Sequence, residues 1–461
     1  MKHTLQQYFP ALKDAYLVGG CVRDLFLDRS PTDFDMVVLK DPEGAAKTIS
    51  AHTHGHLIRL GKPGFILYRI ILDHAVIDVQ SAKGHTIEED LRQRDFTINA
   101  MAYPTASGEV IDIHGGRTDL KNRIVRMTSE DVFKTDPVRL IRAHRLAAVL
   151  KFDIDPLTLT AIKKNSDKIR TSAGERIREE LFQMLRVDNV HTHLMDMAES
   201  DLLFAIFPGL SSLKGCTQNR FHTEDVLAHN LSTIGYMDHI FATLKGFQPN
   251  LFHRLADRLD DHSRVLLKFS ALMHDIGKPS SKSIDENGDT HFYGHEKVGV
   301  KIIGSVFGHL KLSNHDARFI EHMVRNHLSP LQLFQSEKQR RLTPKGVARF
   351  FMKNGEMTPF VLLHALADQM AKEKKEDHRY RHFISKLLED FFSRFKTIRH
   401  KPKLVSGNDL IREFGLSPSP LFKTILTRIE EKRLSEEITT KAEALSQVRQ
   451  YLRSKDLLSG S

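Results

Sequence analysis

The stretch "LVGGCVRDLFLDRSPTDFDMVV", residues 17–38, combines two glycines, an arginine and a pair of aspartates in one short segment. If "TDFDMVVL" (32–39) forms a strand, its side chains alternate between two faces, so Asp33 and Asp35 point the same way while Phe34 points toward the core. When two carboxylates lie so close together, each raises the pKa of the other. Such a pair persists mainly where a proton or a divalent cation compensates the charge. Magnesium fits this need, because it takes one or two carboxylates and fills its remaining positions with water and phosphate oxygens.

The glycine pair and the arginine of the same stretch indicate an anion site. Gly19 and Gly20 follow the apolar "YLV" and permit a tight turn whose bare amides approach a phosphate, with a following helix adding its positive N-terminus. Arg23 offers a forked donor to the same anion. A glycine pair alone usually marks a turn, and Asp-x-Asp alone is more often a solvated loop. Their order and spacing together describe a nucleoside triphosphate held between backbone, arginine and metal.

Composition and charge limit the class of protein. The chain has 461 residues, a length that suggests roughly three domains. With 40% apolar and 27% charged residues it can fold throughout, and because it lacks a long apolar run and a secretory signal we expect a cytoplasmic globular protein without membrane contact. Cys21 and Cys216 are too few for a disulfide framework or a cysteine zinc site. A formal charge of +10 favours a polyanionic partner such as nucleic acid, although a merely basic surface is the alternative.

The pattern of apolar residues predicts an α+β fold. From about 16 to 125, short apolar runs such as "DMVVL" and "AVIDVQ" between turn signals predict a small mixed sheet with helices. From about 131 onward, apolar residues recur three and four apart, as in "GERIREELFQML", which predicts helices. Glycine, proline and serine interrupt this pattern near 207–221 and 398–410. We therefore predict a head (1–130), a helical nucleotide-selecting and RNA-binding region (131–215), a helical metal-binding domain (216–398) and a C-terminal helical region (399–461).

Four sequence blocks carry a family resemblance. "LVGGCVRDLFL", "DFD", "EEDLRQRDFTINAMAY" and "DPVRLIRAHRLAAVLKF" together resemble the class II tRNA nucleotidyltransferase and bacterial poly(A) polymerase family over about the first 200 residues. In that family a nucleotidyltransferase head with a mixed sheet adds nucleotides to an RNA 3′ end without a nucleic-acid template. The resemblance implies that Gly20 and Arg23 contact the triphosphate and that Asp33 and Asp35 hold catalytic magnesium.

The later blocks imply residues that contact and select the nucleotide. The matching positions are Arg94, Asp136, Arg139 and Arg142, and the spacing of the last three predicts one side of a helix. The alternatives are an ordinary surface ion-pair ladder for Arg139 and Arg142 and, for Asp95, the N-cap of a helix over "FTINAMA". Asp78 in "VIDVQSA" is either a third carboxylate of the metal site or a strand-end residue. Thr135 stands where the family often has glutamate, so the choice of bases stays open.

A second constellation lies between residues 222 and 368, where imidazoles and carboxylates suit one or two divalent metals. Its adjacent His-Asp pair and its order of ligands resemble the HD phosphohydrolase superfamily. The resemblance assigns His229, His274, Asp275 and Asp368 to a first metal and His295 and His327 to a second. The chain has 26 histidines, so any single one is more often a surface residue than a ligand. The alternatives are an active phosphodiesterase or phosphatase and an inactive helical scaffold that binds tRNA.

The combined reading is an enzyme that adds CCA, or its terminal A, to tRNA from CTP and ATP by in-line attack of the 3′-hydroxyl on the α-phosphate. Addition of A only, a division of CC and A addition between two proteins, and poly(A) synthesis are neighbouring alternatives. "HLIRLGKPGFILYRI" (56–70) lacks doubled basic residues, which disfavours the last. A noncatalytic RNA-binding module and an HD-type phosphohydrolase with a vestigial head are alternatives from other classes. The sequence gives no indication of oligomeric state.

Overall fold

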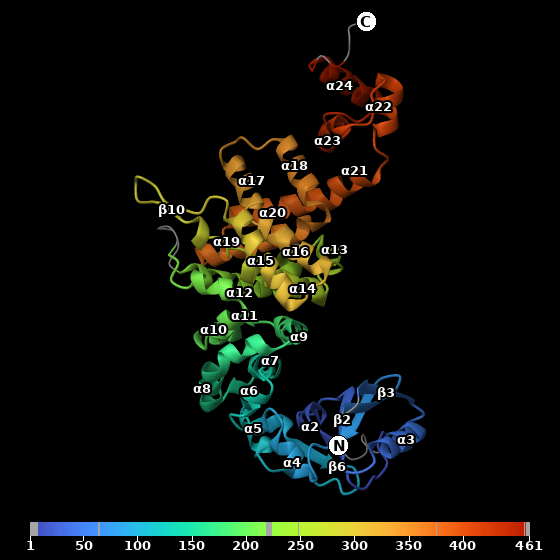
Figure 1. The fold of residues 1–461 in the computed structure, drawn as a ribbon. Coiled ribbons are helices and arrows are strands. Elements are labelled where there is room, and N and C mark those ends of the chain that lie inside the picture. The colour runs from blue at the N-terminus through green and yellow to red at the C-terminus, as the bar shows by residue number, and fades with distance from the viewer. Residues whose placement is uncertain are drawn as a thin grey trace. The chain divides into compact units, whose positions relative to one another are not determined.

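The computed structural model describes residues 8–62, 65–217, 224–247, 249–374, 376–455 and 457. The chain forms two compact units, an N-terminal unit (Met1–Pro208) and a C-terminal unit (Gly209–Ser461). The N-terminal unit contains the sheet, and the C-terminal unit is almost entirely helical (Figure 1). The predicted α+β class, with a small mixed sheet followed by helices, is confirmed. The finer division into four domains stays a prediction, and residues 218–221 of the predicted boundary at 207–221 lie outside the described residues.

The sheet of the N-terminal unit has the strand order β3-β4-β5-β2-β1-β6-β7. Its strands are β1 (Ala15–Val18), β2 (Asp33–Val38), β3 (His56–Lys62), β4 (Phe65–Ile71), β5 (Val76–Ser81), β6 (Met101–Pro104) and β7 (Ile111–Asp112). β2 and β5 pair in parallel and the other neighbours are antiparallel, so the sheet is mixed. Helices α2 (Gly20–Phe26) and α3 (Pro42–Thr53) connect β1 to β2 and β2 to β3.

The strand β2 shows the alternation that its sequence predicts. Asp33 and Asp35 are exposed, whereas Phe34 between them is only 3% exposed. Val37 shares the aspartate face and packs with Ile87 and Leu91 of helix α4 (Ile87–Arg92). This helix therefore covers one end of the aspartate face and leaves the end with Asp33 and Asp35 open to solvent.

Helices complete the N-terminal unit. They are α5 (Gly116–Asn122), α6 (Val132–Thr135), α7 (Arg139–Leu150), α8 (Pro156–Asn165), α9 (Gly174–Leu185), α10 (His191–Glu199) and α11 (Leu202–Ile206). Short strands β8 (Ile124–Val125) and β9 (Asp153–Ile154) pair in parallel beside them. Helix α7 packs against α9 and α10 through the apolar residues of "RLIRAHRLAAVL", which are largely buried.

Two local expectations are wrong. Asp136 has an extended conformation after α6, and α7 begins only at Arg139, so the selecting residues do not share one helix face. Pro137 explains the break, because proline disfavours helical conformation in the residue before it. "FTINAMA" is not a helix either: Thr97–Asn99 forms one 3-10 turn and the chain then enters β6.

The C-terminal unit is built around helix α19 (Thr358–Glu373), which is buried along most of its length. Helices α12 (Val226–Phe247), α14 (Asp261–Met273), α16 (Asn314–Asn326), α17 (Ser329–Lys338) and α20 (His378–Asp390) surround it. The unit also contains α13 (Phe252–Ala256), α15 (His295–Leu310), α18 (Pro344–Asn354), α21 (Lys396–His400) and a hairpin of β10 (Ser283–Ile284) and β11 (Thr290–His291).

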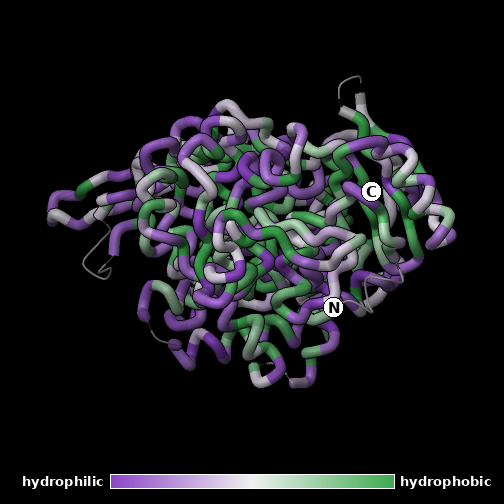
Figure 2. The backbone as a smooth tube through the Cα atoms, turned by 90° about the horizontal axis from the view of Figure 1, so that it is seen from below, coloured by the Kyte–Doolittle hydropathy of each residue, from purple (hydrophilic) through white to green (hydrophobic). Residues whose placement is uncertain are grey.

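The last helices form a small core of their own. They are α22 (Gly407–Phe414), α23 (Pro420–Leu434) and α24 (Lys441–Arg453), and their cluster includes Leu410, Ile425 and Leu452. The side chains of Thr440 and Glu443 form a capping box that starts α24 and separates it from α23. Hydrophilic stretches, in purple, alternate with hydrophobic stretches, in green, along the chain (Figure 2). Within the described ranges, no helix has both the length and the apolar character that crossing a membrane requires.

Candidate functional site

Three carboxylates lie on the open part of the sheet. Asp35 pairs with Asp78 in the parallel register of β2 and β5, so their side chains share a face with Asp33. Arg69 of β4 donates to both oxygens of Asp78 at 2.8 Å. Partial loss of water raises the pKa of the Asp35 carboxyl. The positive charge of Arg94 lowers this pKa, and the negative charges of Asp78 and Asp33 raise it further.

These carboxylates fit a divalent cation. Arg69 neutralises Asp78, whereas no described cation forms an ion pair with Asp33 or Asp35. Among the described residues, Asp78 does not form a three-ligand cluster with Asp33 and Asp35, because Arg69 holds both oxygens of Asp78. Magnesium needs only one or two protein carboxylates, so the pair Asp33 and Asp35 is sufficient. Whether Asp78 joins them as a ligand stays a prediction.

The turn between β1 and α2 brings the backbone against this pair. Gly19 has φ +75°, a conformation that favours glycine, and it precedes the first residue of α2. A Cβ at this position would lie 3.4 Å from Oδ2 of Asp35 and 3.3 Å from Nη1 of Arg94. Gly19 thus lets a carboxylate and a guanidinium meet at one turn, and Gly20 follows directly as the start of α2.

Neighbouring carboxylates orient two arginines of the head, Arg23, which is predicted to contact the triphosphate, and Arg94, which is predicted to contact the nucleotide. Arg23 donates from Nε and Nη2 to the two oxygens of Asp24 at 2.9 and 3.0 Å, and from Nη1 to Asn99 at 2.8 Å. Arg94 donates to Oδ2 of Asp90 from Nε at 2.9 Å, and Asp90 is 3% exposed. Both guanidinium groups are therefore held in fixed planes, and that of Arg94 lies near Asp35.

Arg142 forms the ion pairs that the alternative reading expected. Its Nε donates to Glu180 at 2.8 Å and its Nη1 donates to Asp95 at 3.1 Å, while Arg145 binds the other oxygen of Glu180 at 2.5 Å. Burial alone would lower the pKa of Arg142, but Glu180 and Asp95 raise it. Arg142 also lines a cavity of about 160 Å³ together with Arg94 and Arg139. The network and a nucleotide contact are compatible, because the ion pairs place the guanidinium at the cavity wall.

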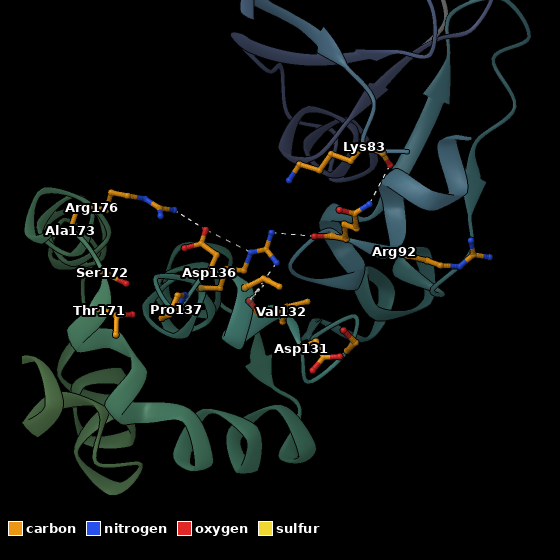
Figure 3. A pocket seen from close by; sticks show the side chains of 14 residues that line it. Lys83, Arg92, Asp131, Val132, Asp136, Pro137, Thr171, Ser172, Ala173 and Arg176 are labelled. Carbon is orange, nitrogen blue, oxygen red and sulfur yellow. Dashed lines mark hydrogen bonds and ion pairs between the residues drawn. The ribbon is translucent and has the colours of Figure 1, made fainter. Parts of the chain in front are cut away.

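A larger cavity of about 650 Å³ lies beside Asp136 and Arg139 (Figure 3). Nη2 of Arg176, on α9, donates to Oδ2 of Asp136 at 2.7 Å. Oδ1 of Asp136 and Nε of Arg139 are buried and have no hydrogen-bond partner. Both residues line the cavity, so a donor and an acceptor without hydrogen-bond partners lie beside it, and Nε of Arg139 is 3.9 Å from Oδ2 of Asp136. Thr135 also lines the cavity, and its hydroxyl donates to the carbonyl of Val132 at 3.2 Å.

Sequence reasoning missed Arg176 and Glu180, the α9 partners of Asp136 and Arg142. Both lie in "GERIREE" four positions apart, so they face the same side of the helix. The residues that they bind are some 40 positions earlier, and no local pattern connects the two segments. The alternating charges of α9 were the available signal, but they equally suit a solvated helix.

In the C-terminal unit, backbone carbonyls orient three buried imidazoles in the same way. Nδ1 of His274, His295 and His327 lies 2.8 Å from the carbonyl oxygen of Ala271, Phe292 and Val324, respectively. A proton on Nδ1 satisfies these carbonyls and leaves Nε2 of each ring free to coordinate. This is the tautomer that a divalent metal needs.

Two carboxylates stand among these imidazoles. Oδ1 of Asp275 lies 3.1 Å from Nε2 of His295 and 3.6 Å from Nε2 of His327. Its Oδ2 lies 3.2 Å from Nε2 of His274. Asp368 approaches His229 at 2.9 Å. The ligand atoms form two groups that share His274, and within each group they lie within 4.8 Å of one another. One group is His229, His274 and Asp368, and the other is His274, Asp275 and His327.

The charged groups of this cluster shift one another's pKa values. Burial acts to lower the pKa of His274, but Asp275 and Asp368 outweigh it and raise the pKa. The pKa of His327 falls well below its usual range because of burial and the neighbouring His274 and His295. All six residues predicted as metal ligands thus meet in one buried cluster, and their donor set fits one or two divalent ions.

Two further residues of this cluster escaped the sequence reading. His364 is fully buried with both ring nitrogens unpartnered, and its ring centroid lies 5.2 Å from that of His274. It precedes Asp368 by one helical turn, which was a usable signal. Lys278 of "HDIGKP" contacts Oδ2 of Asp275 at 2.6 Å. A cavity of about 150 Å³ adjoins the cluster and is lined by His327, Asp368, Lys338 and Lys372.

Family models match three parts of the chain. One described as "Poly A polymerase head domain" matches residues 15–126, and one described as "Probable RNA and SrmB- binding site of polymerase A" matches residues 151–214. A model described as "HD domain" matches residues 250–375. The order of the matches agrees with the resemblance read from the sequence motifs.

Curated relatives match nearly the whole chain. An A-adding tRNA nucleotidyltransferase of Deinococcus radiodurans is 29% identical over 446 residues, which cover 95% of this chain and 95% of the relative. A CC-adding tRNA nucleotidyltransferase of Thermus thermophilus is 28% identical, covering 94% of this chain and 92% of the relative. A CC-adding tRNA nucleotidyltransferase of Geobacter sulfurreducens is 38% identical over 42% of this chain and 45% of the relative.

Solved structures share the fold. A CCA-adding enzyme in complex with CTP has a TM-score of 0.65 at 22% identity and covers 95% of this chain and 91% of its own. The CCA-adding enzyme of Thermotoga maritima complexed with tRNA has a TM-score of 0.62 at 21% identity, with coverage of 95% and 91%. At these identities the likeness concerns the fold.

Proposed function

Because this enzyme belongs to the class II tRNA nucleotidyltransferase and bacterial poly(A) polymerase family and has an HD domain, we propose that it adds CCA, or its terminal A, to the 3′ end of tRNA. The substrates would be CTP and ATP. The observation that carries the proposal is the open carboxylate pair Asp33 and Asp35, with the Gly19 turn against it.

Each part of the site has a role in the proposed reaction. The Gly19 turn, Gly20, Arg23 and Arg94 would bind and orient the triphosphate. Magnesium held by Asp33 and Asp35 would stabilise charge on the attacking and leaving oxygens. The RNA 3′-hydroxyl would attack the α-phosphate in line, and pyrophosphate would leave.

The base would be selected at the larger cavity. Asp136 and Arg139 offer the unpartnered acceptor and donor, and Arg176 fixes the other oxygen of Asp136. A site built to hydrogen-bond a base discriminates against a base that leaves its buried groups unpaired. Arg142, positioned by Asp95 and Glu180, would contact the nucleotide from the smaller cavity.

Nucleotide incorporation into three tRNA transcripts tests this function. The transcripts end before CCA, after the first two C residues, or with complete CCA, and each is incubated with magnesium and labelled CTP or ATP. We expect CTP and then ATP to be incorporated into the shortest transcript and ATP alone into the second, with nothing added to the third. Repeated addition of ATP to the third would indicate poly(A) synthesis, and no incorporation into any transcript would overturn the proposal.

Addition of A alone is the second candidate, and the full-length match to the A-adding relative favours it. In that case ATP would be incorporated only into the transcript that already ends in CC, and CTP would not be used. CTP incorporation without ATP incorporation would instead place the chain with its CC-adding relatives. The same assay therefore separates the three modes of addition.

For the C-terminal unit we propose a metal-dependent phosphohydrolase site acting on RNA ends. The orientation of Nε2 in His274, His295 and His327 supports it. We expect a divalent ion to accelerate hydrolysis of bis(p-nitrophenyl) phosphate. An ion present at 100 times its Kd would also add ~2.7 kcal/mol to stability and raise the melting temperature.

His295→Gln is the variant that tests this site, and His309→Gln is its control. His309 is an exposed histidine at the other end of the same helix, α15. Hydrolysis should vanish and the metal-induced rise in melting temperature should become smaller in His295→Gln, whereas both should persist in full in His309→Gln, with nucleotide addition retained in both variants. If the metal has no effect on the wild-type chain, the unit is a helical scaffold.

A further inference from the structure

A buried histidine of the N-terminal unit lies outside both sites. His144 is on α7, is fully buried, and has no hydrogen-bond partner at either ring nitrogen. A buried polar group without a partner is costly, and each such group requires an explanation. Both ring nitrogens of His144 therefore lack a partner that would prevent either of them from acting as a ligand.

Helix α10 brings two further ligand groups to this ring. His193 and Asp196 are one helical turn apart in "HTHLMDMAE", with Nδ1 of His193 at 4.0 Å from Oδ2 of Asp196. A nitrogen of His144, a nitrogen of His193 and an oxygen of Asp196 all lie within 4.8 Å of one another. Nδ1 of His193 is buried and also has no hydrogen-bond partner.

We propose that His144, His193 and Asp196 bind a divalent transition metal of the zinc type between α7 and α10. Two imidazoles and one carboxylate form a common zinc ligand set, with water as the fourth ligand. Metal–ligand bonds of about 2.0 Å place tetrahedral ligand atoms roughly 3.3 Å apart. The distances between the ligand atoms therefore need to shorten by no more than ~1.5 Å.

The surroundings of the cluster favour a cation. Asp153 and Glu199 lie near enough to act electrostatically on His193 and Asp196, respectively. The side chain of Asp196 is 48% exposed and that of His193 is 22% exposed, so an ion can enter from solvent although His144 is buried. This site is distinct in position from the HD cluster, which belongs to the C-terminal unit.

The proposed ion has a consequence for the selecting helix. His144 lies between Arg142 and Arg145 in the sequence of α7, and Arg139 begins the same helix. A metal bond from His144 to α10 would fix α7 from the side opposite to its arginines. His144, His193 and Asp196 would thus act as positioning residues, without touching the nucleotide.

Metal analysis of the full-length chain tests the proposal. The chain is stripped with chelator, loaded with zinc and desalted, and bound zinc is measured per chain by mass spectrometry. Asp196→Asn and His193→Gln should each bind one equivalent less than wild type, whereas His74→Gln, in an exposed turn of the same unit, should bind the wild-type amount. The same loss should occur in the His295→Gln background, which separates this site from the HD site.

Cobalt loading gives a second measurement. Cobalt(II) loaded into the His295→Gln background should produce visible absorption of tetrahedral ions, and Asp196→Asn should remove the part of this absorption that the His144 site contributes. Asp196 is half exposed, so this substitution leaves the packing of α10 intact, and circular dichroism verifies the fold. Equal zinc content in all variants, or no cobalt band, would overturn the proposal.

Discussion

Asp35→Asn is expected to reduce the rate of nucleotide addition by at least ~1,000-fold, equivalent to about 4 kcal/mol of transition-state stabilisation. The substitution keeps the size of the side chain but removes one of the two carboxylates that would hold the cation beneath the triphosphate. Asp35 is exposed at the open end of the β2 face, so the fold should not change. Single-turnover incorporation of labelled ATP or CTP into tRNA measures the effect.

Asp73→Asn serves as the matched control for this substitution. Asp73 is an exposed carboxylate in the turn between β4 and β5, and its variant should incorporate nucleotides at the wild-type rate. Asp78→Asn should cause a smaller loss than Asp35→Asn, because Arg69 already engages both oxygens of Asp78. Hydrolysis at the HD site should be unchanged in every variant. Wild-type incorporation by Asp35→Asn would contradict the assignment of the carboxylate pair.

The parts of the site that follow a local pattern could be predicted from the sequence. The alternation of Asp33, Phe34 and Asp35 is visible in β2, because a period of two fixes which residues share a face. The Gly19 turn likewise depends on residues adjacent in the chain. The ordered HD ligands could be identified as a set, because the resemblance supplied both residue types and order.

The contacts that join distant segments could not be predicted. The pairing of Arg69 with Asp78 depends on the register of β4 and β5, and Arg176 reaches Asp136 across 40 positions. The break before α7 was missed for a different reason. The spacing of Asp136, Arg139 and Arg142 was taken as one continuous helix, although Pro137 interrupts it. His144 gave no signal at all, since a histidine among apolar residues of a helix is more often a core residue.

Arg142→Met has the largest expected effect on stability, because it leaves two buried carboxylates short of a partner. Asp95 and Glu180 are each 7% exposed, and Arg142 donates to both. Breaking a buried ion pair from one side costs about 3 kcal/mol, and methionine keeps the apolar stem. Hydrogen exchange of the α7 and α9 backbone amides should therefore accelerate by roughly 100-fold at neutral pH.

The pH dependence of this effect identifies Asp95 as its cause. In the wild type the pKa of Asp95 is lowered, since Arg142 and Asn99 outweigh the raising effect of burial. Its contribution to stability is thus present above the ordinary carboxyl pKa and is lost as pH falls through the lowered value. Without Arg142, burial raises the pKa of Asp95, and the folded variant favours the protonated carboxyl. The difference in hydrogen-exchange rate between wild type and Arg142→Met should therefore be largest near neutral pH and should become smaller in acid.

Arg145→Met is the control for the pH dependence, because it leaves Arg142 bound to both carboxylates. The hydrogen-exchange rates of Arg145→Met should increase less than those of Arg142→Met. The difference in exchange rate between Arg145→Met and wild type should also not narrow in acid in the same way. A double-mutant cycle with Asp95→Asn isolates the pair: once Asp95 is neutral, Arg142→Met should cost markedly less than in the wild-type background. If the two substitutions instead add independently, the Arg142 and Asp95 ion pair does not stabilise the junction between α7 and the loop that carries Asp95.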